Sequence, residues 1–328
     1  MPGTDRRQAA TSPGRIYLLL LLTIVLWGGS PVAGKLAVQE LPPVTVGVLR
    51  YGAGSLILFL LFGGRLRAWR QIRRRDRWLL LSVGLLGTFL NHLAFYGGLV
   101  LAPASHAAIL SPTTSPIWTM LLAARFGGER ITRSQIVGIT LCMMGVVLVA
   151  SPGNAAVTVT GRVLVGDLLL LLSGLAWGAY SFLTKAAMRR LSAMAVLAYG
   201  MVIGSMLLFP VALLERPWTR LATASSWAWG SLLYVTVCAT LLAAFWWNLA
   251  IQRLGAGRTA VFGNLTPVLG VLLSWAVLGE RLTPLQLFGG LLTVAGVWAC
   301  QGPAAMHAAW RQVRVRLADA VLPGAEKR

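Results

Sequence analysis

Residues 267–297 read PVLGVLLSWAVLGERLTPLQLFGGLLTVAGV, which is an apolar run, a short polar break and a second apolar run. Residues 116–146 read PIWTMLLAARFGGERITRSQIVGITLCMMGV and have the same construction. The two stretches are 151 residues apart and share 12 of 31 positions, including Gly-Glu-Arg-x-Thr-x-x-Gln-x-x-Gly in register. Apolar segments match by chance at leucines, but not also at Glu, Arg, Thr, Gln and Gly. The chain is therefore predicted to be a duplication.

Composition assigns the duplicated unit to the membrane. Hydrophobic residues make up 57% of the chain and charged residues 12%, against about 25% charged in soluble domains. Apolar runs of roughly 20 residues, the length of a bilayer-spanning helix, recur along the whole sequence. The three cysteines lie inside these runs and are interpreted as packing residues. We expect no cofactor and no metal site.

Ten spanning helices are expected, five in each half of the chain. In the first half, residues 16–151, the runs cover about 16–36, 44–62, 78–98, 104–124 and 134–151. In the second half, residues 163–302, they cover about 163–184, 193–214, 227–250, 259–278 and 284–301. The remaining segments are an N-terminal tail (1–15), a linker (152–162) and a basic C-terminal tail (303–328). The predicted fold class is an all-α membrane protein with ten transmembrane helices in two five-helix repeats.

The first apolar run follows basic residues, as a secretory signal does. However, its Trp27-Gly28 pair and Lys35 recur 150 residues later as Trp177-Gly178 and Lys185. We therefore interpret this run as a retained helix of the repeat.

Positive charge falls mainly on alternate connections between these helices. If the N-terminus is cytoplasmic, the connections on that side and the two tails hold 23 of the 29 Lys and Arg residues. Lys and Arg favour cytoplasmic loops, so both termini of this multi-pass protein are predicted to be cytoplasmic. Topology and contact with anionic lipid account for the net charge of +20. No nucleic-acid partner is expected.

An odd number of helices in each repeat inserts the second copy upside down. Glu129 then lies at the cytoplasmic face and Glu280 at the opposite face. Inverted repeats are typical of transporters that expose one central site alternately to each side of the membrane. The sequence therefore predicts a transporter that works by alternating access.

The paired units resemble the EamA group of the drug/metabolite transporter superfamily. The resemblance rests on the repeated Gly-Glu-x-x-Thr-x-x-Gln-x-x-Gly motif, and on Gly166-Asp167-Leu168 before Trp177-Gly178, and it covers about residues 16–302. It implies a bacterial inner-membrane exporter of small metabolites with a cavity between the two halves. The best-understood ten-helix members carry amino acids, including aromatic ones. We expect such a small-molecule substrate, contact with membrane lipid and a monomer.

Polar and aromatic side chains inside the spans are candidates for the cavity wall, because such groups mark transport pathways. Tyr96 follows His92 by four residues and so shares its helix face, and the repeat places Trp247 in the position equivalent to Tyr96. Packing or anchoring at the membrane interface is the alternative role for these residues. The expected cavity residues are Trp27, Asn91, His92, Tyr96, Ser111, Ser115, Trp177, Tyr180, Trp247, Asn248, Asn264 and Thr266.

Helix-breaking and gating roles are expected for Pro112, Pro116, Pro267, Glu129 and Glu280. Proline frees backbone carbonyls from the helix ladder. A glutamate near a helix N-terminus is favourable for the helix dipole, so both glutamates are expected to cap helices.

Cations near the helix ends are interpreted mainly as interfacial anchors. Arg50 is expected to extend to the membrane interface, with binding of an anionic group as the alternative. Lys35 and Lys185, which end the first helix of each half, are expected to be anchors.

The positions of the acidic residues restrict the class of solute that the protein is expected to carry. All nine, including Asp167, are expected outside the middle of the spans, whereas pumps of organic cations usually keep a buried carboxylate. A zwitterionic, neutral or anionic solute is therefore favoured, with its carboxylate meeting His92, Arg50 or tyrosine hydroxyls. Proton coupling would have to use His92 or His106, and facilitated diffusion or exchange fits the sequence equally well.

Three other functions are alternatives to metabolite export. The first is export of drugs or other organic cations, and the second is a role in moving lipid-linked sugars, as short members of this superfamily have. An enzyme is not expected, because the three histidines are scattered and no nucleophile motif or cluster of metal ligands is present in the sequence.

Overall fold

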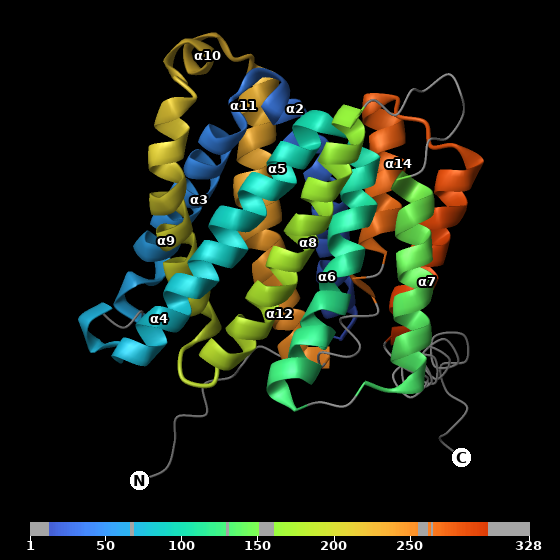
Figure 1. Cartoon of the computed structure of the whole chain (residues 1–328). Coiled ribbons are helices and arrows are strands. Elements are labelled where there is room, and N and C mark those ends of the chain that lie inside the picture. The colour runs from blue at the N-terminus through green and yellow to red at the C-terminus, as the bar shows by residue number, and fades with distance from the viewer. Residues whose placement is uncertain are drawn as a thin grey trace, which may run out of the picture.

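The computed structural model describes residues 13–65, 69–128, 131–150, 161–254, 262–263 and 265–300. Within these ranges the chain is helical and contains no β-strand. The helices pack side by side into one bundle (Figure 1).

The first half begins with α1 (Pro13–Gly28) and α2 (Ser30–Glu40), which together form one span, and continues with α3 (Pro43–Phe62). Two short 3-10 turns, η1 (Gly63–Arg65) and η2 (Trp69–Gln71), lead to a composite helix. This helix consists of α4 (Arg74–Val83), the π-helix η3 (Gly84–Leu90) and α5 (Asn91–Leu101). The half ends with α6 (Ala104–Gly127) and α7 (Arg133–Ala150).

The second half repeats this order. It begins with α8 (Gly161–Ala187), α9 (Ala193–Leu214) and the short α10 (Trp218–Thr223). A second composite helix follows, made of α11 (Ser226–Leu233), the π-helix η4 (Tyr234–Leu242) and α12 (Ala243–Leu254). The described part ends with α14 (Thr266–Leu278) and the helix Pro284–Cys300.

The described residues hold seven helices that are long and apolar enough to span a bilayer. Three shorter apolar helices, Arg133–Val149, Thr266–Leu278 and Pro284–Cys300, occupy the places of other expected spans. The all-helical membrane fold is as predicted, and a total of ten spans stays a prediction. Large apolar side chains on the outside of the bundle, such as Leu60, Leu214 and Trp227, are 76%, 82% and 79% exposed, as suits contact with lipid.

Local backbone chemistry explains the motif that the two halves share. Gly128 and Gly279 have φ of 72° and 67° and end α6 and α14 in the left-handed conformation that favours glycine. The Thr-x-x-Gln that follows is a reciprocal helix cap. Gln286 Oε1 accepts from the Thr283 N–H at 3.1 Å, and Thr283 Oγ1 accepts from the Gln286 N–H at 3.3 Å. Thr132 and Gln135 form the same pair of bonds in the first half.

The glycines of the motif bring the last helices of the two halves into close contact. A Cβ on Gly138 would lie 2.6 Å from the Gly296 carbonyl oxygen, and a Cβ on Gly289 would lie 2.8 Å from that of Gly145. Because the earlier glycine of each helix meets the later one of the other, α7 and the helix Pro284–Cys300 run antiparallel. Any larger residue at these positions would push the two helices apart.

Three glutamates cap helices at one end of the bundle. We call this end the capped end; it consists of the last residues of α2, α9 and α14 and the first residues of α3, α6 and α11. Glu215 accepts from the backbone N–H groups of Val44 and Thr45 at 2.9 and 2.8 Å, and Glu40 accepts from that of Ser225 at 2.6 Å. Each acid belongs to one half and caps a helix of the other half. The upper end of the bundle in Figure 1, near α10 and α11, is this end.

Candidate functional site

An arginine is held inside the bundle by hydroxyl groups. Arg50 is the eighth residue of α3, its Nε donates to Thr240 Oγ1 at 2.8 Å, and its Nη1 donates to Tyr96 Oη at 3.1 Å. Its guanidinium carbon lies 5.0 Å from the centre of the Tyr51 ring. Arg50 therefore points into the bundle, and the expectation that it extends to the membrane interface is wrong.

The charge of Arg50 has only neutral hydrogen-bond partners. Among the residues that the structure describes, no carboxylate forms an ion pair with it. A cation without a counter-ion in a low-dielectric interior is unfavourable, and a guanidinium has five N–H donors in a planar fork that matches a carboxylate. The site is chemically suited to an anionic group.

His92 and Tyr51 form the wall behind Tyr96. The rings of His92 and Tyr96 stack with centroids 4.3 Å apart, and the Tyr51 ring meets His92 edge-on at 5.6 Å. His92 Nε2 donates to the Pro43 carbonyl at 2.8 Å, whereas its buried Nδ1 has no hydrogen-bond partner among the residues that the structure describes. His92 is 1% exposed, so it supports Tyr96 from behind.

Both composite helices change to π geometry in the same place. η3 begins at residue 84 and η4 at residue 234, a separation of 150 that matches the repeat. In η4, Thr240 Oγ1 donates to the Val235 carbonyl five residues earlier at 2.7 Å and accepts from Arg50. π-Helical segments occur frequently at functional sites, and here one of them supplies a partner of the buried cation.

Two tryptophans, one from each half, lie next to this π-helix. The rings of Trp27 and Trp247 are 5.0 Å apart and tilted by 49°. Trp27 Nε1 donates to the Ala239 carbonyl at 2.9 Å, one residue before Thr240. This pair joins an aromatic ring of each half at the π-helix that also carries Thr240.

Three predicted cavity residues belong to the contact between helices instead. Asn91 Nδ2 donates to the Ser173 carbonyl at 3.0 Å, and Ser173 Oγ donates to Ser111 Oγ at 2.7 Å. Ser115 is 6% exposed and lies where a Cβ on Gly178 would approach its carbonyl oxygen to 2.8 Å. These residues hold α5, α6 and α8 together.

The remaining candidates are distributed over the bundle. Trp177 and Tyr180 contact each other at 4.8 Å, with Trp177 43% exposed and Tyr180 close to Gly87 of η3. Thr266 begins α14, and its Oγ1 is buried without a hydrogen-bond partner.

Two of the three predicted helix-breaking prolines line the same small hollow. Pro112 of α6 and Pro267 of α14 line a hollow of about 30 Å³, and Pro116 lies one turn further along α6. A larger hollow of about 320 Å³ lies among Arg73, Asp76 and Arg190, at the end of the bundle opposite the capped end. Asn264, Glu129 and the side chain of Asn248 lie outside the described part of the chain.

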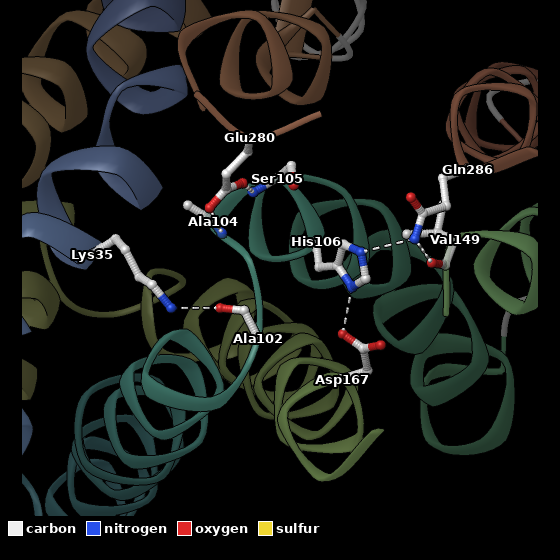
Figure 2. Close-up of polar contacts among 9 residues, drawn as sticks. All are labelled: Lys35, Ala102, Ala104, Ser105, His106, Val149, Asp167, Glu280 and Gln286. Atoms are coloured by element: carbon white, nitrogen blue, oxygen red, sulfur yellow. Dashed lines mark hydrogen bonds and ion pairs between the residues drawn. The ribbon is translucent and has the colours of Figure 1, made fainter. Parts of the chain in front are cut away.

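Glu280 and Lys35 fix the corner between α5 and α6 (Figure 2). Glu280 accepts from the N–H groups of Ala104 and Ser105 at 2.7 and 2.8 Å, at the positive end of α6. Lys35 Nζ donates to the Leu99 carbonyl and, at 2.7 Å, to that of Ala102, at the negative end of α5. The interfacial role expected for Lys35 is therefore wrong.

Asp167 is a buried acid close to the beginning of α8. It lies within α8, 1% exposed and 2.8 Å from His106 Nδ1. The sequence analysis did not predict its burial, because that burial arises from α5 and α6, which cover this part of α8. Thr240 and Asp167 were not among the predicted site residues, and His106 was named only as one of two histidines that proton coupling could use. A lone threonine in an apolar run gives little indication of such a role.

This arrangement is that of a multi-pass membrane transporter. A model of the EamA-like transporter family matches residues 14–151 and again residues 164–300, so the chain belongs to this family.

The chain is similar along most of its length to several curated proteins. One is an uncharacterized transporter, YyaM, of Bacillus subtilis (strain 168), 27% identical over 88% of this chain and 93% of the relative. A second is a probable terminal-alkyne amino-acid exporter of Streptantibioticus cattleyicolor, 29% identical over 85% and 90%. A third is a probable amino-acid metabolite efflux pump of Escherichia coli (strain K12), 27% identical over 86% and 93%.

A solved crystal structure shares the fold. It aligns with a TM-score of 0.62 over 90% of this chain and 99% of its own length, at 19% sequence identity. The family and the names of the relatives place the chain among transporters rather than enzymes.

Proposed function

We propose that this protein exports amino acids, or similar small metabolites that carry a carboxylate, across the bacterial inner membrane. The observation that carries the proposal is Arg50, which is bonded to Thr240 and Tyr96 and has no carboxylate partner in the described residues. A substrate carboxylate would supply the missing counter-charge through paired hydrogen bonds. The names of two relatives, a probable terminal-alkyne amino-acid exporter and a probable amino-acid metabolite efflux pump, agree with this substrate class.

The same geometry supports alternating access. Arg50 and Tyr96 belong to the first half and Thr240 to the second, so a bound carboxylate would contact groups from both halves. Relative motion of the halves would then change the site while the substrate is bound. With both termini cytoplasmic, the capped end faces outward, and it must open to release the substrate.

The aromatic pair favours zwitterions over simple acids. Trp27 is bonded to η4 one residue before Thr240 and pairs with Trp247, and the face of such a ring can receive an ammonium group by a cation–π interaction. An α-amino acid presents both charges at once, whereas Arg50 repels an organic cation that lacks a carboxylate. Multidrug export is therefore the less favoured function.

The test uses purified protein in liposomes loaded with a labelled amino acid. An excess of the unlabelled amino acid, its decarboxylated amine or its methyl ester competes inside the vesicle. We expect the intact amino acid to compete and the amine and ester, which lack a free carboxylate, to fail. Equal competition by all three would overturn the proposal, and so would efflux of a cationic dye without amino-acid efflux.

Variants then identify the residue responsible. Arg50→Gln should abolish efflux, and Arg50→Lys, which keeps the charge and loses the fork, should retain a small part of it. Arg125→Gln is the matched control, because Arg125 lies near the end of α6 and its guanidinium stacks on Phe126. If Arg50→Gln reaches the membrane and exports at the normal rate, Arg50 does not bind the substrate.

A further inference from the structure

A buried histidine and a buried aspartate form a pair close to the capped end. His106 is the third residue of α6 and is 4% exposed, and Asp167 is the seventh residue of α8 and is 1% exposed. His106 Nδ1 lies 2.8 Å from Asp167 Oδ1. Figure 2 shows Gln286 on the opposite side of the imidazole. None of these contacts involves Arg50 or its partners, so the pair is separate from the proposed substrate site.

The contacts of Gln286 locate the proton on His106. Gln286 Oε1 accepts from the Thr283 N–H, which leaves the amide nitrogen Nε2 facing the imidazole. This Nε2 lies 3.3 Å from His106 Nε2 and 3.3 Å from the Val149 carbonyl. An amide nitrogen only donates, so His106 Nε2 accepts. The imidazole is therefore neutral, with its proton on Nδ1 and shared with Asp167.

The pair can take up one more proton at His106 Nε2. Within the described part of the chain, Asp167 Oδ2 is buried and has no hydrogen-bond partner, so the carboxylate is incompletely satisfied and would stabilise an imidazolium beside it. The new N–H would point directly at the Gln286 amide, which is also a donor. Two donors at this distance repel, so protonation would displace the Gln286 side chain from His106.

Displacing Gln286 affects the contact between the two halves. Gln286 lies in the first turn of the helix Pro284–Cys300, the last helix of the second half, and follows Glu280 by six residues. Glu280 caps α6 at Ala104 and Ser105, which directly precede His106. The proton site and the cap therefore act on the same first turn of α6, so a change at His106 reaches the capped end directly.

The pair is absent from the repeat, unlike the caps around it. The Thr-x-x-Gln cap occurs in both halves, at Gln135 and Gln286. In contrast, the position 151 residues after His106 is Gly257, and the position 150 residues before Asp167, the spacing that relates the first helices of the two halves, is Tyr17. A titratable pair that the duplicated scaffold does not need, at one end of the molecule, indicates a directional role.

The other charges near the pair are few. Lys35 on α2 and Glu280 after α14 lie at the α5–α6 corner and are bonded to backbone, and Arg162 on α8 is exposed. On the other packed elements, α5 carries His92 and Tyr96 in the Arg50 site, α14 has no ionisable side chain, and α7 contributes the Val149 carbonyl. Among the described residues, His106 and Asp167 are therefore the ionisable side chains in direct contact here.

We propose that His106 and Asp167 form a proton-binding site, and that a proton bound there opens the capped end and couples export to external pH. The proposal rests on the transport function proposed above. The proton comes from the side that the capped end faces, and its release restores the Gln286 contact and closes that end.

The first experiment measures amino-acid efflux from proteoliposomes at external values between about pH 5 and about pH 8, where imidazoles change charge. We expect efflux by the unaltered protein to rise several-fold toward acid, and His106→Gln and Asp167→Asn to lose this rise. His92→Gln is the matched control, a buried histidine without a carboxylate partner, and its ratio of acid to neutral efflux should be unchanged. Efflux by the unaltered protein that does not depend on pH would overturn the proposal while leaving the export function intact.

The second experiment does not depend on the substrate. Spin labels at Gln39 on α2 and Leu285 on the last helix, both exposed, report the separation of the halves at the capped end in a background without cysteine. We expect acid to lengthen this distance in the unaltered protein and not in His106→Gln. Gln286→Leu should give the longer distance already at neutral pH, because the contact is removed.

The alternative is that the pair only holds α6 against α8. In that case the variants would lower efflux by the same factor at every pH, and the label distance would not respond to acid. Either result contradicts the proposal. If His106→Gln does not fold, the pH dependence of Asp167→Asn and the label distance in Gln286→Leu still test the proposal.

Discussion

Arg50 of α3 donates a hydrogen bond of 2.8 Å to Thr240 of η4, so a cation of the first half is oriented by a hydroxyl of the second half. Tyr96 holds the other side of the guanidinium. The orientation of the proposed carboxylate site therefore depends on how the two halves are placed relative to each other.

Thr240→Val should weaken substrate binding. Valine keeps the shape of threonine but cannot accept from Arg50 Nε, so the guanidinium loses its orientation. A hydrogen bond to a charged group contributes about 1.5–3 kcal/mol, which corresponds to roughly tenfold or more in the KM of efflux. Thr240→Ser, which keeps the hydroxyl, is the control and should transport nearly normally. An unchanged KM in Thr240→Val would show that this bond does not support the site.

Trp27→Phe should reduce transport more than stability. Phenylalanine keeps a ring against Trp247 but removes the indole N–H that donates to the Ala239 carbonyl. Loss of one such bond costs about 1 kcal/mol, and it releases the π-helix next to Thr240. We expect efflux to fall several-fold with a small decrease in Tm. Trp229→Phe, on the partly exposed part of α11, is the control for loss of an indole.

Glu280→Ala should destabilise the protein, because two N–H groups at the beginning of α6 lose their acceptors. Removing a helix cap costs about 0.5–2 kcal/mol, and the missing charge–dipole interaction adds to this. Thermal unfolding in detergent should show a clear decrease in Tm, smaller for Glu280→Gln, which keeps one oxygen acceptor. Glu326→Ala, in the C-terminal tail, serves as the comparison. Equal melting curves for the two alanine variants would contradict the capping role.

Gly47→Ala should be disruptive. A Cβ at this position would collide with the imidazole of His92 and push it away from Pro43. Overpacking of a closed site typically costs about 1–3 kcal/mol, and displacing His92 also disturbs the stacked Tyr96 ring. We expect lower Tm and lower efflux together. At Gly63 a Cβ would meet nothing within 4 Å, so Gly63→Ala should behave like the unaltered protein.

The sequence predicted the class of fold because the repeated motif is a set of backbone requirements. Gly279 needs the left-handed conformation, Gln286 closes a helix cap, and Gly138 and Gly145 allow close contact between helices. Each requirement restricts the residue type, so the motif remains recognisable in both copies. Apolar periodicity and length then define the spans.

The contacts inside the site could not be predicted in the same way. Whether Arg50 points to lipid or inward depends on the rotation of α3 about its axis, and apolar composition does not determine that rotation. The π-helices shift the register of the composite helices and bring Thr240 to Arg50, which a model of regular helices does not place there. The burial of Asp167 could not be predicted either, because it depends on the neighbouring helices α5 and α6, which cover this part of α8.

The crosswise capping at one end has a consequence for the history of the gene. Glu40, Glu215 and Glu280 each cap a helix in the opposite copy. Neither copy alone therefore contains all the acceptors for its own helix N-termini. If a deletion returned the gene to a single unit, the glutamates of that unit would lose the N–H groups that they accept from. The beginnings of its helices would lose their caps. Such a shortened product would have to assemble as an antiparallel pair to recover those contacts. The duplication has thus made each copy the obligate counterpart of the other.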